Sequence, residues 1–279
     1  MNLQEIIKAA LIEDIGSGDH TSLATIPIGA MGKARLLVKQ KGILAGVDVA
    51  AEVFNIMDST IIMHRLLQDG TPVNPGDIAF TVDGPSRSLL MAERLVLNFM
   101  QRMSGIATET RKYADVLTGL KAKVLDTRKT TPNFRWIEKE SVRIGGGLNH
   151  RFGLYDMILI KDNHIDFCGG IKNALENTRK YLLDNELSIK VEIEARSLAD
   201  VREILDIAFA DRIMLDNFER SDLRSAVAMI GDQAETEASG GITLENIRAY
   251  GECGVDFISV GALTHQIHSL DLSLKAIHG

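Results

Sequence analysis

Cysteine and aromatic residues are scarce in this chain. Its 279 residues include two cysteines, one tryptophan and 5% aromatic residues in all. Cys168 and Cys253 lie far apart without a CxxC spacing, so we expect two reduced thiols and a cytoplasmic location rather than a disulfide framework or a zinc site. No stretch approaches the roughly 20 apolar residues that a membrane helix needs. The N-terminus has Glu5 and Glu13 within an amphipathic pattern, which is not typical of a signal peptide.

Basic residues are fewer than acidic ones, with 31 Lys and Arg against 38 Asp and Glu and a formal net charge of −7. This balance argues against nonspecific binding to nucleic acid, which needs a basic face. One stretch is nevertheless basic, and its cations are Arg128, Lys129, Arg135, Lys139, Arg143, Arg151 and Lys161. A solvated helix face explains the members at 135, 139 and 143. It does not explain Arg128, Lys129 and Arg151, which sit beside a strand end or a glycine run and therefore predict an anion-binding site.

The first half of the chain predicts a small α+β sandwich domain. Helical spacing covers residues 2–13 and 47–57, and short strand-like runs cover residues 34–38, 61–67 and 78–82. Residues 86–117 have a helical pattern in which Gly105 predicts a break between two helices. We expect this domain to span residues 1–107, with the tail at 265–279 packing on it.

Residues 108–264 predict a second domain, an α/β barrel of six or seven parallel strands. Six β-rich runs are expected at residues 123–125, 157–160, 190–193, 212–215, 234–237 and 257–260. The helical stretches between them fall near residues 133–144, 170–184, 198–207, 219–230 and 243–251. This alternation is typical of right-handed βαβ units in a parallel sheet. The number of strands, without a dinucleotide fingerprint, favours a barrel over an open sheet.

Polar or glycine residues follow the expected strands where each strand ends. They lie at residues 126–129, 161–162, 194, 216–217, 239–241 and 261. In α/β barrels these strand ends converge on one face, where ligands bind. A single acid after a strand is often only a helix cap, but six ends that together offer cations, carboxylates and glycine turns predict an active site for a small, multiply anionic substrate.

The cations at this face suit carboxylate and phosphate oxygens. Arg128 supplies a planar fork and Lys129 a point charge. His150 and Arg151 follow the glycine run at 145–147, which is flexible enough to wrap a ligand. Lys161 ends an apolar strand and is expected to point into the barrel mouth, where an unpaired structural lysine is costly.

Glycines and acids supply the rest of the predicted site. Ser239, Gly240 and Gly241 precede a helix expected to begin near Thr243, an arrangement suited to a phosphate. Gly261 follows the last strand, where barrels often bind phosphate. Glu194 and Asp216 could hold sugar hydroxyls, contact a metal or stabilise a developing cation. Glu192 has the same strand parity as Glu194, so the pattern alone does not decide which of them faces the site. His265 and His268 have no third ligand nearby and read as part of the tail.

The chain resembles the quinolinate phosphoribosyltransferases, also called carboxylating nicotinate-nucleotide pyrophosphorylases, which are type II phosphoribosyltransferases. The main motifs are DTRKTTP at 126–132, GGGLNHRFGL at 145–154 and LIKDNH at 159–164. Further matches are EDIGSGD at 13–19, ER at 93–94, SGIAT at 104–108, LDNF at 215–218, SGGI at 239–242 and VGALT at 260–264. Asn133 and Ala238 depart from the usual glycine and serine, at peripheral positions.

The resemblance implies a pentosyltransferase of NAD biosynthesis. Quinolinate and phosphoribosyl pyrophosphate would give nicotinate mononucleotide, pyrophosphate and CO2, with Mg²⁺ as cofactor. It further implies specific roles, with Lys129, Lys161, Glu194 and Asp216 as the catalytic set. Quinolinate carboxylates would be bound by Arg128, His150, Arg151 and Lys161, and pyrophosphate by Lys129. Glu194, now favoured over Glu192, and Asp216 would be the ribose- and metal-side acids, and the 5′-phosphate would be bound by Ser239, Gly240, Gly241 and Gly261. Arg94 would reach the neighbouring subunit's site, which implies a homodimer or a higher homo-oligomer.

Three alternatives share parts of this pattern. A same-fold relative associated with molybdenum transport generally lacks the run seen at 161–164. A non-catalytic sensor of phosphoribosyl pyrophosphate has less need of Glu194 and Asp216, and product formation distinguishes it. A sugar-phosphate isomerase or synthase on a conventional barrel would leave the surplus of cations without a role.

Overall fold

The computed structural model describes residues 2–277, which form two compact units. Unit 1 contains residues 2–111, 130–146 and 263–277, and unit 2 contains residues 112–129 and 147–262. Residues 130–146, expected in the barrel domain, therefore group with unit 1. Unit 2 lies between pieces of unit 1 along the chain.

Unit 1 is built on a four-stranded antiparallel sheet with the strand order β12-β1-β5-β3. Its strands are β1 (Met31–Val38), β3 (Ile62–Arg65), β5 (Ile78–Pro85) and β12 (Leu272–Ala276), and β2 (Gly42–Ile43) pairs separately with β4 (Pro72–Val73). Its helices are α1 (Leu3–Ile15), α2 (His20–Thr25), α3 (Val47–Met57), α5 (Arg135–Gly145) and most of α4 (Ser86–Val116). The tail joins this sheet because β12 pairs with β1 from Ala34↔Ala276 to Val38↔Leu272.

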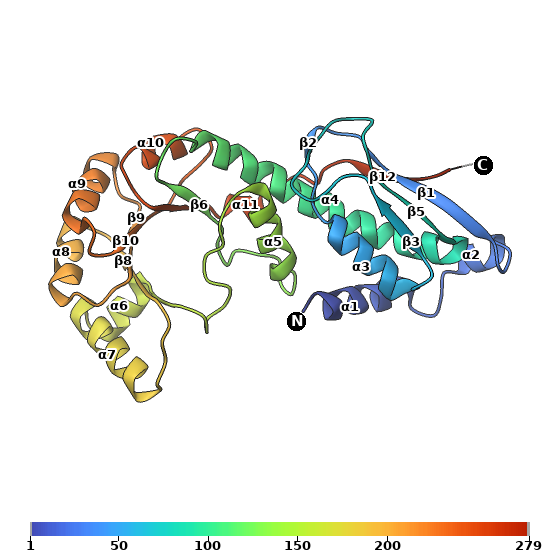
Figure 1. Cartoon of the computed structure of the whole chain (residues 1–279). Helices are drawn as coiled ribbons and strands as arrows, with labels where there is room; N and C mark the ends of the chain where they lie inside the picture. Colours follow the sequence, from blue (N-terminus) through green and yellow to red (C-terminus); the bar gives the residue numbers. More distant parts are fainter. Residues whose placement is uncertain (1, 278–279) are drawn as a thin grey trace. The chain divides into compact units, whose positions relative to one another are not determined.

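The core of unit 1 explains why these elements form. α3 presents Val49, Ala50, Val53 and Phe54 at helical spacing, and all four side chains are buried. Phe54 meets Phe80 of β5 edge to face, with ring centroids 6.0 Å apart. Figure 1 follows α3, α4 and the sheet through this unit.

α4 is one continuous helix, so the expected break at Gly105 is wrong. A Cβ atom at Gly105 would lie 2.3 Å from the carbonyl oxygen of His268 and 3.2 Å from Cα of Ser269. The glycine is needed because the tail chain passes against the helix backbone. It does not interrupt the helix.

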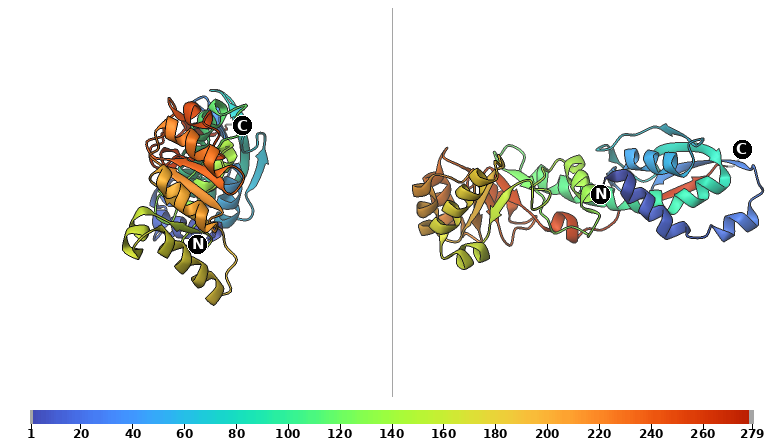
Figure 2. Two further views of the ribbon diagram at one scale, coloured as in Figure 1. Left: turned by 90° about the vertical axis from the view of Figure 1, so that its left-hand side faces the viewer. Right: turned by 90° about the horizontal axis from the view of Figure 1, so that it is seen from below.

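Unit 2 is an open α/β barrel, whose six parallel strands form one sheet in the order β6-β11-β10-β9-β8-β7. Its strands are β6 (Lys123–Leu125), β7 (Ile158–Ile160), β8 (Val191–Ala195), β9 (Arg212–Asp216), β10 (Glu235–Ser239) and β11 (Phe257–Ser259). Its helices are α6 (Asp162–Cys168), α7 (Ile171–Asp184), α8 (Leu198–Ile207), α9 (Arg220–Ile230) and α10 (Ile247–Gly251), while the short α11 (Ala262–His265) runs on into unit 1. Figures 1 and 2 show α7, α8 and α9 on the outside of the strands.

The sheet of unit 2 has β6 and β7 at its two ends. Within the described residues these two strands do not pair with each other. Instead, Leu148 forms a single parallel bridge with Leu125 of β6. The residues that follow the 145–147 glycine run are thereby placed next to the carboxyl end of β6.

One expected helix begins later than predicted, and one helix was not expected. α10 begins at Ile247, and residues 243–246 form a turn in which Asn246 accepts the Thr243 N–H at 2.8 Å and donates to the Gly241 carbonyl at 3.0 Å. The short α6 at the carboxyl end of β7 was not expected, because its polar sequence has little apolar periodicity. No helix in the described part of the chain is long and apolar enough to cross a membrane.

Candidate active site

The carboxyl ends of β7, β8 and β9 bring one cation and two acids together. Lys161 follows β7 as the N-cap residue of α6, Glu194 lies in β8, and Asp216 is the last residue of β9. Glu194 is 6% exposed, and its pKa is raised by burial and then by the negative charge of Asp216, while Lys161 acts in the opposite direction. These mutual effects place the three groups in one electrostatic neighbourhood, as the strand-end pattern predicted.

Two arginines, one in the loop after β6 and one in the loop before β7, lie close enough to interact electrostatically. The pKa of Arg151 is lowered by burial and then by the positive charge of Arg128. The Nε atom of Arg128 is buried and makes no hydrogen bond within the described residues, while Nη1 of Arg151 donates to the Met157 carbonyl at 3.2 Å. Two neighbouring guanidinium groups with unused donors are suited to a carboxylate or phosphate ligand.

Lys129 and Arg94 occupy different units. Lys129 is exposed in the loop after β6, where its backbone N–H donates to Oγ1 of Thr127 at 3.0 Å. Arg94 is exposed on α4 and belongs to unit 1.

The glycine turn after β10 interlocks with the turn after β9. Gly240 has φ +95°, and a Cβ atom there would lie 2.1 Å from Oδ1 of Asn217. Asn217 has φ 55°, donates its backbone N–H to the Ser239 carbonyl at 2.9 Å and donates Nδ2 to Oδ2 of Asp216 at 2.6 Å. Asn217 thus links the acid at the end of β9 to the predicted phosphate turn, a role that the sequence pattern did not predict.

The expected helix N-terminus directly behind Gly241 is absent from the described structure, since α10 starts only at Ile247. Gly241 is exposed with φ +59° and open space where a side chain would lie. Gly261 follows β11 and immediately precedes α11. An anion bound at residues 239–241 would therefore meet the backbone of a turn and not the start of α10.

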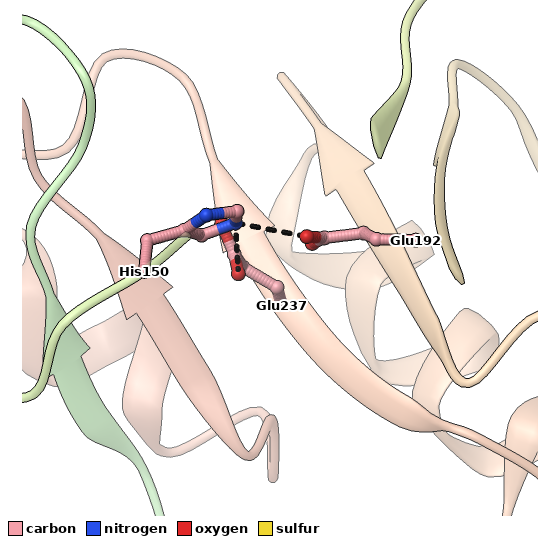
Figure 3. A group of neighbouring side chains, drawn as sticks. All are labelled: His150, Glu192 and Glu237. Carbon is pink, nitrogen blue, oxygen red and sulfur yellow. Dashed lines mark ion pairs between the residues drawn. The ribbon is translucent and has the colours of Figure 1, made fainter. Parts of the chain in front are cut away.

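His150 is 9% exposed and belongs to a cluster with two acids that come from separate strands (Figure 3). Its Nε2 lies 2.8 Å from Oε2 of Glu192 in β8 and 3.5 Å from Oε2 of Glu237 in β10. Its Nδ1 accepts the backbone N–H of Arg151 at 2.7 Å. Direct bonding of the ring to a substrate carboxylate, as expected from the sequence, would require it to give up one of these contacts.

The two acids of this cluster are among the most deeply buried carboxyl groups of unit 2. Burial raises the pKa of Glu192 to about 7. Burial, and then the charge of Glu192, raises the pKa of Glu237 to about 8, and Arg212 opposes this shift. The ambiguity between Glu192 and Glu194 is resolved by their neighbours: Glu192 faces His150, whereas Glu194 shares its surroundings with Asp216 and Lys161. The position of Glu237, two residues before Ser239 in β10, gave no signal that it would join them.

A pocket of about 400 Å³ lies against β7, α6 and α7. Its wall includes Arg151 and His164, but the other lining residues are mainly apolar, among them Leu154, Ile158 and Tyr181. Of the predicted site residues it reaches only Arg151. It is therefore poorly suited to an anionic substrate.

Comparisons with known proteins agree on one family. Residues 19–104 match the model of the quinolinate phosphoribosyl transferase N-terminal domain, and residues 106–275 match that of the C-terminal domain. The chain is 46% identical to quinolinate phosphoribosyltransferase [decarboxylating] 1b of Nicotiana tabacum, over 98% of this chain and 82% of the relative. It is 42% identical to a probable nicotinate-nucleotide pyrophosphorylase [carboxylating] of Bacillus subtilis, over 98% and 93% of the two chains. The crystal structure of NadC from Streptococcus pyogenes superposes with a TM-score of 0.93 at 38% identity, covering 99% of this chain and 97% of that one.

Proposed function

This chain belongs to the quinolinate phosphoribosyltransferase family, and we propose how its own residues carry out that family's reaction. The enzyme is a pentosyltransferase that converts quinolinate to nicotinate mononucleotide with loss of CO2, a step of NAD biosynthesis. The phosphoribosyl donor in this proposal is phosphoribosyl pyrophosphate. The observation that carries it is the gathering of Lys161, Glu194 and Asp216 at adjacent strand ends.

Quinolinate is assigned to the cations of unit 2. Burial, and then the positive charge of Arg128, lower the pKa of Arg151, so the two guanidinium groups repel each other. A ligand with two adjacent carboxylates would relieve that repulsion and use the guanidinium donors. Lys161 would add a third cation from the end of β7. His150 would bind a substrate carboxylate by exchanging its contact with Glu192 or with the Arg151 N–H for the ligand. An acidic protein thereby concentrates positive charge where its anionic substrate binds.

The phosphoribosyl group is assigned to the opposite part of the strand-end face. The turn at Ser239, Gly240 and Gly241, together with Gly261, would bind the 5′-phosphate, and exposed Lys129 would contact pyrophosphate. Departure of pyrophosphate leaves oxocarbenium-like charge on the ribose, and Glu194 and Asp216 would stabilise it. Loss of CO2 would then leave an electron pair on the ring carbon next to the positively charged nitrogen, which would stabilise it until the carbon takes up a proton.

Mg²⁺ fits the two acids chemically. Glu194 and Asp216 are carboxyl groups from neighbouring strands, and the pKa of Glu194 is raised by burial and then by the charge of Asp216. Carboxylate oxygens are the ligands that Mg²⁺ prefers, and it commonly binds through one or two of them plus substrate phosphates. When bound, the ion would neutralise charge on the pyrophosphate.

Assembly and location complete the proposal. Arg94, which is exposed on α4, matches the family position that implies a contact with a neighbouring subunit's site, so the proposal includes a homodimer or higher homo-oligomer. The two free thiols, Cys168 and Cys253, support a cytoplasmic location. Some plant relatives are named as mitochondrial or chloroplastic proteins.

The test is a product assay with a matched substrate. The protein is incubated with phosphoribosyl pyrophosphate, Mg²⁺ and either quinolinate or nicotinate, which lacks one carboxylate. Loss of one charged contact costs about 1.5–3 kcal/mol, so kcat/KM for nicotinate should be roughly ten- to a hundredfold lower. Comparable values for the two substrates would contradict the assigned carboxylate site, and absence of product would contradict catalysis altogether.

A further inference from the structure

The ring of His150 is held between two unlike sets of partners. On one side Nδ1 accepts the Arg151 backbone N–H at 2.7 Å, so this nitrogen carries no proton. On the other side Nε2 faces two carboxyl groups, with Oε2 of Glu192 at 2.8 Å. The backbone of His150 is fixed as well, because its N–H donates to Oδ1 of buried Asp126 at 2.8 Å.

This arrangement excludes the metal site that the three side chains suggest at first sight. His150, Glu192 and Glu237 each offer a ligand atom within 4.8 Å of the others. A metal-bound histidine, however, donates its second ring N–H to an acceptor. Here the second ring nitrogen is itself an acceptor. A metal at Nε2 would therefore require an imidazole without any ring proton. The cluster is suited to a proton on Nε2 and not to a metal ion.

We propose that Glu192 and Glu237 are positioning residues that hold His150 as the Nε2–H tautomer, so that Nδ1 keeps the Arg151 main chain in place. Carboxyl oxygens of the two acids lie 2.8 and 3.5 Å from Nε2, close enough for their negative charge to favour a proton on that nitrogen, although neither contact has the geometry of a regular hydrogen bond. Figure 3 shows both acids directed at the same ring nitrogen. The inference rests on the proposed function only for what Arg151 then binds.

The acids are themselves fixed by the sheet. Nη1 of Arg212 in β9 donates to Oε2 of Glu237 at 3.1 Å, and the same arginine donates to Oε2 of Glu235 through Nε and Nη2. Glu192 and Glu237 are fully buried. A chain of contacts thus runs from Arg212 through Glu237 and His150 to the backbone of Arg151. In low dielectric surroundings such a chain has a strong preference for one orientation of its donors.

The tautomer is measured directly by NMR. The full-length, ligand-free protein is labelled with [15N]histidine, and the His150 signals are assigned by their loss in His150→Asn. We expect one tautomer near neutral pH, with the proton on Nε2 and an unprotonated Nδ1. A proton on Nδ1, in the other neutral tautomer or in an imidazolium, would overturn the inference without any variant of the acids.

Three substitutions then test the role of the acids. Glu192→Met removes the acceptor at similar length, and we expect a mixture of tautomers with KM for quinolinate roughly three- to tenfold higher and kcat less affected. Glu192→Gln keeps a carbonyl oxygen that can accept from Nε2 and should restore both the spectrum and KM. Glu235→Gln is the matched control, since Glu235 shares Arg212 and β10 with Glu237 but has no contact with His150 among the ion pairs and hydrogen bonds described. It should leave the His150 spectrum unchanged.

The outcomes separate this inference from the proposed function. A wild-type tautomer and KM in Glu192→Met would overturn the inference while quinolinate turnover stands. A protein with the expected spectrum that makes no nicotinate mononucleotide would overturn the function and leave the tautomer assignment in place. If Glu192→Met does not fold, Glu237→Met gives the second test. It should also produce a mixture of tautomers, and a wild-type spectrum in that variant would overturn the inference.

Discussion

Gly105 lies directly against the backbone of His268, so that a Cβ atom on the glycine would be 2.3 Å from the His268 carbonyl oxygen. In an exposed helix, replacing glycine by alanine stabilises by about 1 kcal/mol. Here Gly105→Ala should destabilise by roughly 1–3 kcal/mol, because the tail backbone must move away from α4. Urea unfolding measures the change. A variant as stable as the parent would mean that the tail is free to yield at this point.

The pKa of Glu237, raised by burial to about 8, gives stability an unusual pH dependence. The unfolded carboxyl titrates near its ordinary value of 4.5, so between these two values the folded state binds the extra proton. The contribution of Glu237 to the free energy of unfolding is therefore fully present below about pH 4.5 and is lost as the pH rises through 8. Glu237→Gln cannot ionise, so its free energy of unfolding should gain on the parent's by up to about 1.4 kcal/mol per pH unit across this window.

Glu235→Gln serves as the control for that pH dependence. Glu235 also pairs with Arg212, but its pKa is lowered by hydrogen bonds from Lys190 and Arg212, which outweigh its burial. Its stabilisation is present above the ordinary carboxyl range and lost only in acid. The difference between Glu235→Gln and the parent should thus stay constant from pH 5 to pH 8, and parallel curves for Glu237→Gln as well would contradict the pKa assigned to Glu237.

The glycine turn after β10 offers a matched pair of substitutions. Gly240→Ala places its Cβ on the Asn217 side chain, whereas Gly241→Ala meets open space and only strains a positive φ. If the turn binds the 5′-phosphate, Gly240→Ala should weaken phosphoribosyl pyrophosphate binding roughly tenfold or more, with little effect on quinolinate. Calorimetry with each ligand alone measures both. Equal losses for the two ligands, or an equal effect of Gly241→Ala, would count against the phosphate assignment.

The shared site proposed around Arg94 is tested by subunit complementation. Arg94→Ala and Lys161→Ala should each be nearly inactive alone. Heterodimers of the two variants contain one site that is wild type at both positions. Random reassortment gives about half heterodimers with one good site each, so co-refolding should restore roughly a quarter of the activity. Heterodimers that form but stay inactive would place Arg94 in its own subunit's site or outside catalysis.

Local sequence patterns predicted most of the fold. The bounds of α3, α8 and β6 agree with the sequence prediction because each combines a clear periodicity with polar or glycine residues at its ends. The helix expected from Thr243 failed because its first four residues are held in a turn by the Asn246 side chain. That competition between side chain and backbone is not visible in periodicity.

The sequence predicted the site residues that lie at strand ends, but not those inside the strands. Strand-end position identified Lys161, Glu194 and Asp216, which lie in one electrostatic neighbourhood. Strand-end position did not predict Glu237, because a charged residue inside a strand is expected to face solvent until the neighbouring strands are known. The same reason applies to Gly105, whose requirement comes from a chain segment more than 160 residues away.

The placement of β12 has a consequence for how the protein is made. Unit 2 is translated as a nearly continuous stretch, while β1 waits for a strand that leaves the ribosome only after all of unit 2. The later unit along the chain can therefore complete its fold first, and the earlier one must hold an unpaired β1 edge in the meantime. Nascent chains stalled before residue 272 should expose that edge to chaperones and to self-association, since such edges pair readily with other chains. Pairing of β12 with β1, once the tail has left the ribosome, would cover the exposed edge.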